Sequence, residues 1–291
     1  MFIDVHTHAY QEHDLMSIMD RTRLLDGSLD EQNPNKWSLK HSGDIQGLLE
    51  AEQKAGIDRF VLLPITRVQQ KLRQINTWGY ELSRVYTQII PFATLLPLPY
   101  MDLKKEVEYI VSLGIRGVKI HPFLQHISIR SKDMMMIAEF LSRNDLILLI
   151  DTMNMEGLGY YKPHLASLAL DFMHFSVESK AIADLAVQFT SLKIIAAHLG
   201  CLYKWDDLDL LYGLQNVYFD TSFISPILPR DKVMEIIERK GIEFILFGTD
   251  APWRHPLEVS EWLAQLPLSE EEKDMIKCRN FLRLLGSWEK E

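Results

Sequence analysis

Two histidines, His6 and His8, stand two residues apart near the start of the chain, in the run Phe2-Ile3-Asp4-Val5-His6-Thr7-His8. The apolar residues of this run predict a β-strand, and residues i and i+2 of a strand point to the same face, so both imidazoles converge. Converging imidazoles indicate a metal site, because histidine is the commonest nitrogen ligand for zinc, iron or nickel. The pair alone is a weak signal, since the chain has 10 histidines in 291 residues. Two half-buried histidines bonded to the backbone are the alternative.

Other side chains that can bind metal or carry a proton come directly after apolar runs elsewhere in the sequence. They are Lys119, His121, Asp151, His198 and Asp250. Taken singly, each has an ordinary explanation: Asp151 and Asp250 can cap a turn, and His121 can be a loop residue. They form one site only if the fold brings the ends of their strands together.

Eight apolar runs rich in β-branched residues alternate with helical patterns along the chain. The predicted strands are residues 2–8, 59–64, 89–96, 115–122, 146–151, 192–200, 217–221 and 243–250. The intervals between them are long enough for crossover helices, which indicates a parallel sheet. Eight β/α units predict a (β/α)8 TIM barrel of the α/β class, with a doubly wound sheet as the alternative. The barrel is favoured because polar residues recur at the carboxyl ends of the strands, where barrel enzymes build their sites.

The whole chain, residues 1–291, is expected to form a single domain, because no linker or change of composition divides it. One segment interrupts the alternation of strands and helices. Residues 9–43 are polar and aperiodic, and they predict a long loop inserted after the first strand. Loops of this length often act as lids.

Charge and composition argue against several classes of protein. With 31 basic and 40 acidic residues, the net charge of −9 disfavours binding to nucleic acid or to an anionic membrane. A hydrophobic content of 47% suffices for a sizeable core, and no apolar run approaches the ~20 residues that span a bilayer. Cys201 and Cys278 show no disulfide or zinc spacing. Since the first strand starts at residue 2, leaving no room for a signal peptide, we expect a cytoplasmic protein with a small-molecule substrate. A homo-oligomer is left open.

Four motifs at the predicted strand ends resemble the metal-dependent amidohydrolase superfamily. They are Asp4-x-His6-x-His8, Gly117-Val118-Lys119-Ile120-His121-Pro122, Ala197-His198-Leu199-Gly200 and Phe247-Gly248-Thr249-Asp250-Ala251-Pro252. The branch that they resemble most is the amidohydrolase-2 group, which includes lactonases, hydratases and the aminocarboxymuconate-semialdehyde and resorcylate decarboxylases. Residues 268–286 resemble the closing helix of that branch, so the resemblance spans the chain and implies a TIM barrel.

The resemblance implies that His6, His8 and Asp250 bind a divalent metal ion, and that His198 is either a further ligand or a nearby acid or base. The fifth strand of that branch usually ends in a histidine ligand, whereas this chain has Asp151. If Asp151 binds, it lowers the charge of the centre by one and favours zinc, manganese or iron(II) with mixed ligands. If it does not bind, the site has lost a ligand. The expected cofactor is one Zn²⁺, with Mn²⁺ or Fe²⁺ as alternatives, and a second ion is left open.

These features predict a metal-dependent hydrolase that acts on a small, carboxylate-bearing substrate. A metal-bound water, whose pKa can fall to about 7, would be the nucleophile, and Asp250 or His198 would carry its proton. The predicted substrate-binding residues are Lys119, His121 and Arg254, because a cation at the barrel mouth can hold an oxyanion or a carboxylate. A decarboxylase or hydratase of the same branch is the alternative, since the ligands do not distinguish these reactions. A non-catalytic barrel that binds a small ligand is the alternative of another class.

Overall fold

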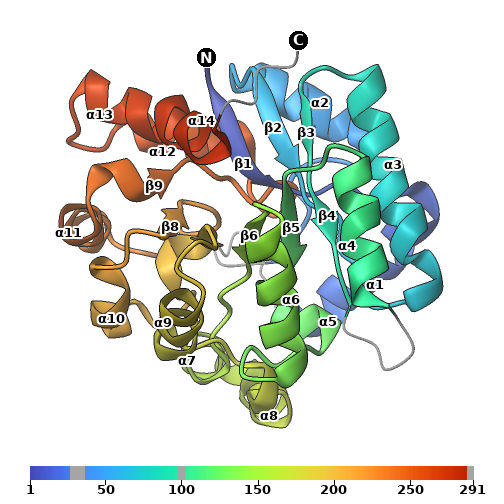
Figure 1. Ribbon diagram of the computed structural model, residues 1–291. Coiled ribbons are helices and arrows are strands. Elements are labelled where there is room, and N and C mark those ends of the chain that lie inside the picture. The colour runs from blue at the N-terminus through green and yellow to red at the C-terminus, as the bar shows by residue number, and fades with distance from the viewer. Residues whose placement is uncertain (27–36, 97–101, 287–291) are drawn as a thin grey trace.

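The computed structural model describes residues 1–26, 37–96 and 102–286 of the chain. In these residues, parallel strands line a central barrel that helices surround (Figure 1). The strands are β1 (Ile3–Thr7), β2 (Arg59–Leu62), β3 (Ile89–Pro91), β4 (Ala93–Thr94), β5 (Gly117–Ile120), β6 (Ile147–Ile150), β7 (Ile194–Ala196), β8 (Val217–Asp220) and β9 (Ile245–Leu246). Every predicted run contains a strand, and the third run is divided into β3 and β4 at Phe92. The predicted TIM barrel is confirmed.

Backbone hydrogen bonds close this barrel between the two ends of the chain. Neighbouring strands pair in parallel from β1 to β3 and from β4 to β9. Beyond β9, the amide of Val5 donates to the carbonyl of Phe247 at 2.9 Å, and the amide of Asp250 donates to the carbonyl of His6 at 2.8 Å. The first and last strands therefore lie side by side, which excludes the open, doubly wound sheet.

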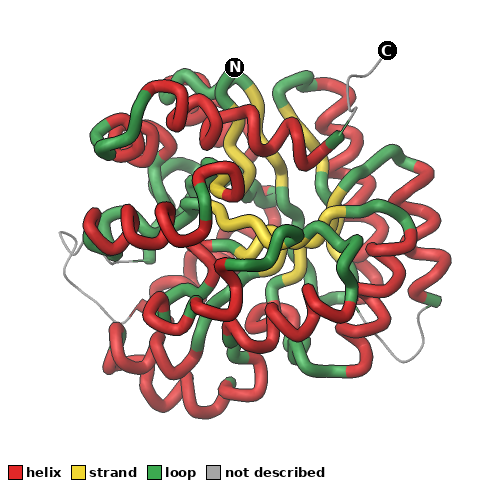
Figure 2. Tube along the Cα trace, turned by 60° about the vertical axis from the view of Figure 1, so that its left-hand side comes forward, coloured by secondary structure: helices red, strands yellow, loops and turns green. Residues whose placement is uncertain are grey.

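Helices from the crossovers cover the outside of the barrel (Figure 2). The longer ones are α2 (Ile45–Lys54), α3 (Leu72–Val85), α4 (Leu103–Ser112), α6 (Lys132–Arg143), α9 (Ser179–Gln188), α11 (Arg230–Lys240) and α12 (Pro256–Ala264), and the shorter ones are α5 (Pro122–Gln125), α7 (Met155–Tyr161), α8 (Ala166–Asp171) and α10 (Asp209–Tyr212). Asp44, Asp102 and Ser131 cap α2, α4 and α6, because each side chain accepts a backbone N–H of the first turn. No helix of the described residues is long and apolar enough to cross a membrane.

The pleat of each strand decides which side chains face the barrel interior. In β6, Ile147 and Leu149 pack in the interior cluster, whereas Leu148 and Ile150 belong to the cluster between the strands and the helices. Alternate residues of a strand share a face. Asp151, the next residue of the inward row, is thereby placed at the carboxyl end of the barrel.

The closing segment fills the opposite end of the barrel. It consists of α13 (Glu270–Asp274), one π-helical turn (Met275–Arg279) and α14 (Asn280–Leu285). Phe281 and Leu284 are each 1% exposed and share the interior cluster with Ile3, the first residue of β1. Apolar side chains thus occupy the amino ends of the strands, and polar groups are left to the carboxyl ends.

The segment after β1 departs from its prediction. The sequence predicts an irregular loop over residues 9–43, but Glu12–Asp26 forms helix α1. This stretch begins Glu12-His13-Asp14, and although Leu15, Ile18 and Met19 stand at helical spacing, Met16 and Leu24 fall on other faces and make the amphipathic period weak. The loop prediction is wrong for these residues. Residues 27–36, also part of the predicted insert, lie outside the described residues.

Candidate metal centre

Seven of the eight predicted site residues meet at the carboxyl ends of the strands. They are His6, His8, Lys119, His121, Asp151, His198 and Asp250, and all are between 0% and 8% exposed. Among the described residues, two overlapping groups have donor atoms within 4.8 Å of one another and could hold a metal ion. One is His6, His8 and Asp250, and the other is His6, Asp151 and His198.

The carboxylate of Asp220 orients the ring of His6. Its Nδ1 lies 2.9 Å from Oδ2 of Asp220 and 3.0 Å from Oγ of Ser222. A carboxylate only accepts, so Nδ1 carries the proton and Nε2 presents its lone pair to the centre. Burial, aided by the nearby charge of Lys119, lowers the pKa of His6 to about 4. The imidazole is therefore neutral, which is the form that binds metals.

His8 is oriented in the same way by a backbone group. Its Nδ1 donates to the carbonyl of Leu63 at 2.9 Å, which turns its Nε2 toward Asp250. The two rings are edge to face, with their centroids 5.2 Å apart. Partners of this kind fix the tautomer of metal-binding histidines.

Asp250 completes the first group of donors. Its Oδ1 lies 3.3 Å from Nε2 of His8 and 3.5 Å from Nε2 of His6. Burial by itself raises the pKa of Asp250, but the hydrogen bond with His8 and the nearby histidines outweigh it and keep the pKa below its usual value. The backbone has φ 67° at Asp250, a left-handed conformation that is uncommon outside glycine and gathers at functional sites.

These three donors suit a divalent metal ion. Two neutral imidazole nitrogens and one carboxylate oxygen are a donor set used by zinc, manganese and iron. Ligands about 2 Å from one ion lie 3 to 4 Å from each other, and the contacts of Asp250 with both histidines fall in that range. The prediction that His6, His8 and Asp250 form a metal site is compatible with this geometry and stays a prediction.

Asp151 is surrounded by donors of the protein itself. Its Oδ2 lies 3.1 Å from Nε2 of His198, 3.4 Å from Nε2 of His121 and 3.6 Å from Nζ of Lys119. Burial opposes ionisation of Asp151, but His121, Lys119 and His198 outweigh it and hold its pKa well below the usual value. Asp151 is therefore an anion whose Oδ2 already has three partners within the protein.

His198 differs from the other two histidines because both ring nitrogens face acceptors. Nδ1 donates to the carbonyl of Ser222 at 2.9 Å, and Nε2 faces Oδ2 of Asp151 at 3.1 Å. Burial lowers the pKa of His198, yet Asp151 more than compensates and raises it to about 9. The contact with Asp151 therefore favours the charged form of His198 in the metal-free protein.

Lys119 lies deeper than a substrate-binding residue at the mouth would. Its side chain is fully buried, and its Nζ is 3.1 Å from Nε2 of His6. Because Nε2 of His6 is the acceptor, this hydrogen bond uses the lone pair that a metal ion needs. Burial lowers the pKa of Lys119 against the attraction of Asp151 and Asp250.

Sequence reasoning missed Asp220 and Ser222, at the end of β8. Asp220 is fully buried, and its Oδ1 accepts the amide hydrogens of His198 and Ser222 while its Oδ2 faces His6. The hydroxyl of Ser222 lies 2.8 Å from Nδ1 of His198. The signal was present, since Asp220 directly follows the apolar residues of the seventh predicted strand. A buried carboxylate at a strand end can therefore orient a neighbouring histidine without itself facing the centre.

Arg254 stands apart from the cluster. It is 3% exposed, and its Cζ lies 4.0 Å from the ring centroid of Phe223. The same ring is 6.2 Å, centroid to centroid, from that of His198. One aromatic ring, that of Phe223, thus lies between Arg254 and His198.

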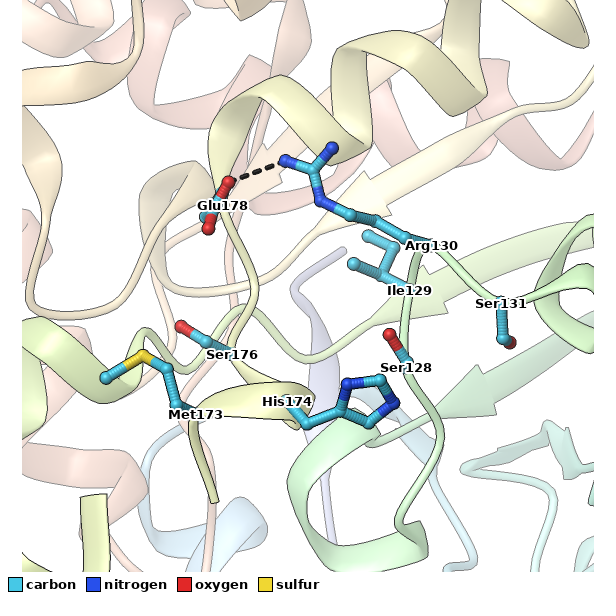
Figure 3. A pocket seen from close by; sticks show the side chains of 8 residues that line it. All are labelled: Ser128, Ile129, Arg130, Ser131, Met173, His174, Ser176 and Glu178. Atoms are coloured by element: carbon cyan, nitrogen blue, oxygen red, sulfur yellow. Dashed lines mark hydrogen bonds and ion pairs between the residues drawn. The ribbon is translucent and has the colours of Figure 1, made fainter. Parts of the chain in front are cut away.

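A hollow of about 290 Å³ lies away from these residues. It is lined by residues 128–131 together with Met173, His174, Ser176 and Glu178 (Figure 3). Arg130 is half exposed there and pairs with Glu178 across the opening, as the dashed line marks. None of the predicted site residues lines this hollow, so it is not the centre of the predicted chemistry.

A closed parallel barrel with histidines and carboxylates gathered at the carboxyl ends of its strands defines the class of metal-dependent TIM-barrel proteins. Within this class, the family model described as amidohydrolase matches residues 3–287, and the chain belongs to that family. The family expected from the strand-end motifs is confirmed. No curated protein sequence matches the chain.

Solved structures of similar fold cover almost the whole chain. A dihydroxybenzoic acid decarboxylase from Polaromonas sp. JS666, with bound manganese and the inhibitor 2-nitroresorcinol, is 18% identical, with a TM-score of 0.72 over 98% of this chain and 96% of that one. A 5-carboxyvanillate decarboxylase from Sphingomonas paucimobilis is 16% identical, with a TM-score of 0.70 over 98% of each chain. A 2,6-dihydroxybenzoate decarboxylase from Rhizobium is 18% identical, with a TM-score of 0.66 over 98% of each chain. At these identities the likeness shows the fold.

Proposed function

We propose that this protein is a metal-dependent decarboxylase of a small carboxylic acid, which was the alternative to hydrolysis at the sequence level. The observation that carries the proposal is the 3.1 Å contact between Nε2 of His198 and Oδ2 of Asp151, which favours a protonated imidazole next to His6, His8 and Asp250. Decarboxylation releases CO₂ and leaves an electron pair on carbon, which must then receive a proton. Hydrolysis instead needs a base that removes a proton from water. A protonated imidazole suits the first requirement.

The structural neighbours support the same choice of reaction. The proteins from Polaromonas, Sphingomonas and Rhizobium are all decarboxylases by name. The manganese of the Polaromonas protein also favours Mn²⁺ over the Zn²⁺ expected from the sequence. We therefore propose Mn²⁺ as the first ion to test, followed by Zn²⁺ and Fe²⁺.

The residues divide into three roles in this proposal. His6, His8 and Asp250 would hold the ion, which when bound supplies a Lewis acid for the anionic oxygens of the substrate. His198 gives its Nε2 proton to the carbon that loses CO₂ and then regains a proton from solvent. Asp151 stabilises the charged form of His198, so it acts on the reaction through that histidine.

The test measures the products of small carboxylic acids incubated with the manganese-loaded protein in D₂O. We expect release of CO₂ and one deuterium on the carbon that bore the carboxylate. His198→Gln should lower kcat by about 10² to 10⁴, the usual contribution of a general acid. Turnover without CO₂ would contradict the proposal.

Hydrolysis is the second candidate, and one observation favours it. The carboxylate of Asp250 touches both ligand histidines, which is where a base for an activated water would lie. Hydrolysis in H₂¹⁸O places ¹⁸O in the product, whereas decarboxylation adds no oxygen. Screening lactones, amides and esters beside the acids therefore separates the two reactions.

A further inference from the structure

Arg254 is a buried cation with unused hydrogen-bond donors. Its side chain is 3% exposed, and Nη1 donates only weakly, to the carbonyl of Trp253 at 3.4 Å. Nε and Nη2 are buried and have no hydrogen-bond partner among the described residues. Burying donors of a charged group without partners is unfavourable by several kcal/mol. This arrangement is therefore expected where a ligand supplies the acceptors.

The two unused donors form one edge of the guanidinium plane. The N–H of Nε and an N–H of Nη2 run parallel and match the two oxygens of a carboxylate. Phe223 fixes the plane, since its ring centroid lies 4.0 Å from Cζ of Arg254. Such a prearranged edge favours a planar anion over a single water molecule.

Tyr203 is a second buried polar side chain. It is 4% exposed, and its hydroxyl has a hydrogen bond with Trp37. Because an indole N–H can only donate, the O–H hydrogen of Tyr203 remains able to donate to a ligand. The ring of Tyr203 lies 6.1 Å, centroid to centroid, from that of Trp205, whose Nε1 donates to the carbonyl of His198 at 2.8 Å. A charge interaction between Tyr203 and Arg254 agrees with this placement. They come from different loops, after β7 and after β9, so the juxtaposition is produced by the fold.

The position of this edge relative to the metal centre decides which end of a ligand it holds. Phe223 contacts both Arg254 and His198, whereas Arg254 forms no part of either donor group. We propose that Arg254 and Tyr203 bind a second carboxylate, one that is retained when CO₂ leaves, and that the substrates are therefore dicarboxylic acids. Calling the ligand a substrate rests on the proposed decarboxylase, but the binding site does not.

Binding is measured by titration calorimetry on the manganese-loaded, full-length protein, with two matched pairs of probes. Isophthalate is compared with benzoate, and glutarate with butyrate. For at least one pair, we expect the diacid to bind ten times more tightly than the monoacid or better. Equal binding of diacid and monoacid in both pairs overturns the proposal, and so does failure of both diacids to bind.

Variants then locate the preference. Arg254→Met is expected to bring the ratio of diacid affinity to monoacid affinity to about one. Arg254→Lys should keep part of this ratio, because the charge remains while the paired N–H donors are lost. Tyr203→Phe should lower the ratio. Arg130→Met, which removes the arginine of the hollow drawn in Figure 3, should leave the ratio unchanged. If Arg254→Met fails to fold, Arg254→Lys and Tyr203→Phe decide. A ratio equal to that of wild type in both of these variants, or one that falls equally in Arg130→Met, overturns the assignment.

The outcomes separate this site from the proposed reaction. If the diacid preference depends on Arg254 while no acid releases CO₂, the site stands and the decarboxylase is wrong. If CO₂ is released from monoacids as fast as from diacids, and Arg254→Lys leaves KM and kcat for both unchanged, the decarboxylase stands and the second carboxylate site is wrong.

Discussion

At the scale of single residues, Asp220 shows how one carboxylate can prepare another residue for metal binding. Its Oδ2 accepts from Nδ1 of His6, which leaves Nε2 of that ring as the ligand atom. Asp220→Asn keeps the shape but removes the charge and introduces a donor toward Nδ1. We expect metal affinity to fall by about 10- to 100-fold, the usual loss when such a partner is changed. Competition with a chromophoric chelator measures it.

A matched control for Asp220→Asn is Asp206→Asn. The side chain of Asp206 is 94% exposed and pairs with Lys232 at the surface, so its loss should leave metal affinity within twofold. If Asp220→Asn also binds the ion as tightly as wild type, then His6 is oriented by something other than this carboxylate.

The charge of His198 predicts how the stability of the metal-free protein depends on pH. Its pKa is raised from 6.5 to about 9, mainly by Asp151 acting against burial. Between these values the folded protein binds a proton that the unfolded chain has lost. The free energy of unfolding therefore falls as pH rises, by at most about 1.4 kcal/mol per pH unit from this group. Denaturant titrations of chelator-treated protein from pH 6.5 to 9 measure the slope.

Asp151→Asn tests the cause of that slope. Without the carboxylate the pKa of His198 drops, and the variant should lose the fall in stability over this interval. Burial lowers the pKa of Lys240 to about 8, which adds an opposite trend above pH 8, but wild type and variant share it. Equal slopes in the two proteins would show that Asp151 does not hold the proton on His198.

At the scale of elements, the closing helix supports the barrel without taking part in its chemistry. Phe281 of α14 is 1% exposed and packs at the amino end of the strands. Phe281→Ala should lower the free energy of unfolding by about 3 to 5 kcal/mol, because it leaves a cavity in this cluster. Leu282→Ala, on the same helix but 38% exposed, should cost much less. Denaturant unfolding measures both, and metal affinity should change in neither variant.

The elements also show which local features the sequence predicts. Each apolar run became a strand, because a strand buried on both faces must be apolar along its whole length. Helix α1 was missed because Glu12–Asp26 carries little apolar periodicity. Asp220, at the end of β8, follows an apolar run as the predicted site residues do, but it was not named among them. Its contact with His6 depends on side chains of another strand, and no local pattern of the sequence specifies that contact.

At the scale of the whole molecule, the gathering of the site residues was predictable but their pairing was not. Parallel strands in a closed barrel bring all carboxyl ends to one mouth, so His6, Asp151 and Asp250 had to become neighbours. That Asp151 would contact His198, and that Lys119 would reach His6, depends on side-chain directions set by long-range packing. The choice between ligand and proton carrier for His198 rests on those contacts. The strand-end motifs therefore predicted the family and the gathering of these residues at one end of the barrel, but not their pairing.

Metal binding should couple directly to closure of the barrel, because the first group of donors comes from the two ends of the chain. His6 and His8 belong to β1 and the turn after it, and Asp250 follows β9, where backbone hydrogen bonds join the first and last strands. An ion present at 100 times its Kd stabilises the folded state by about 2.7 kcal/mol. Excess chelator should therefore lower the Tm by at least about 5 °C and speed hydrogen exchange at the amides of Val5 and Asp250. His8→Ala should start from the lower Tm and respond little to either ion or chelator. If wild type and His8→Ala lose the same Tm on chelation, the ion is held elsewhere, because a centre built on His8 cannot survive its removal unchanged.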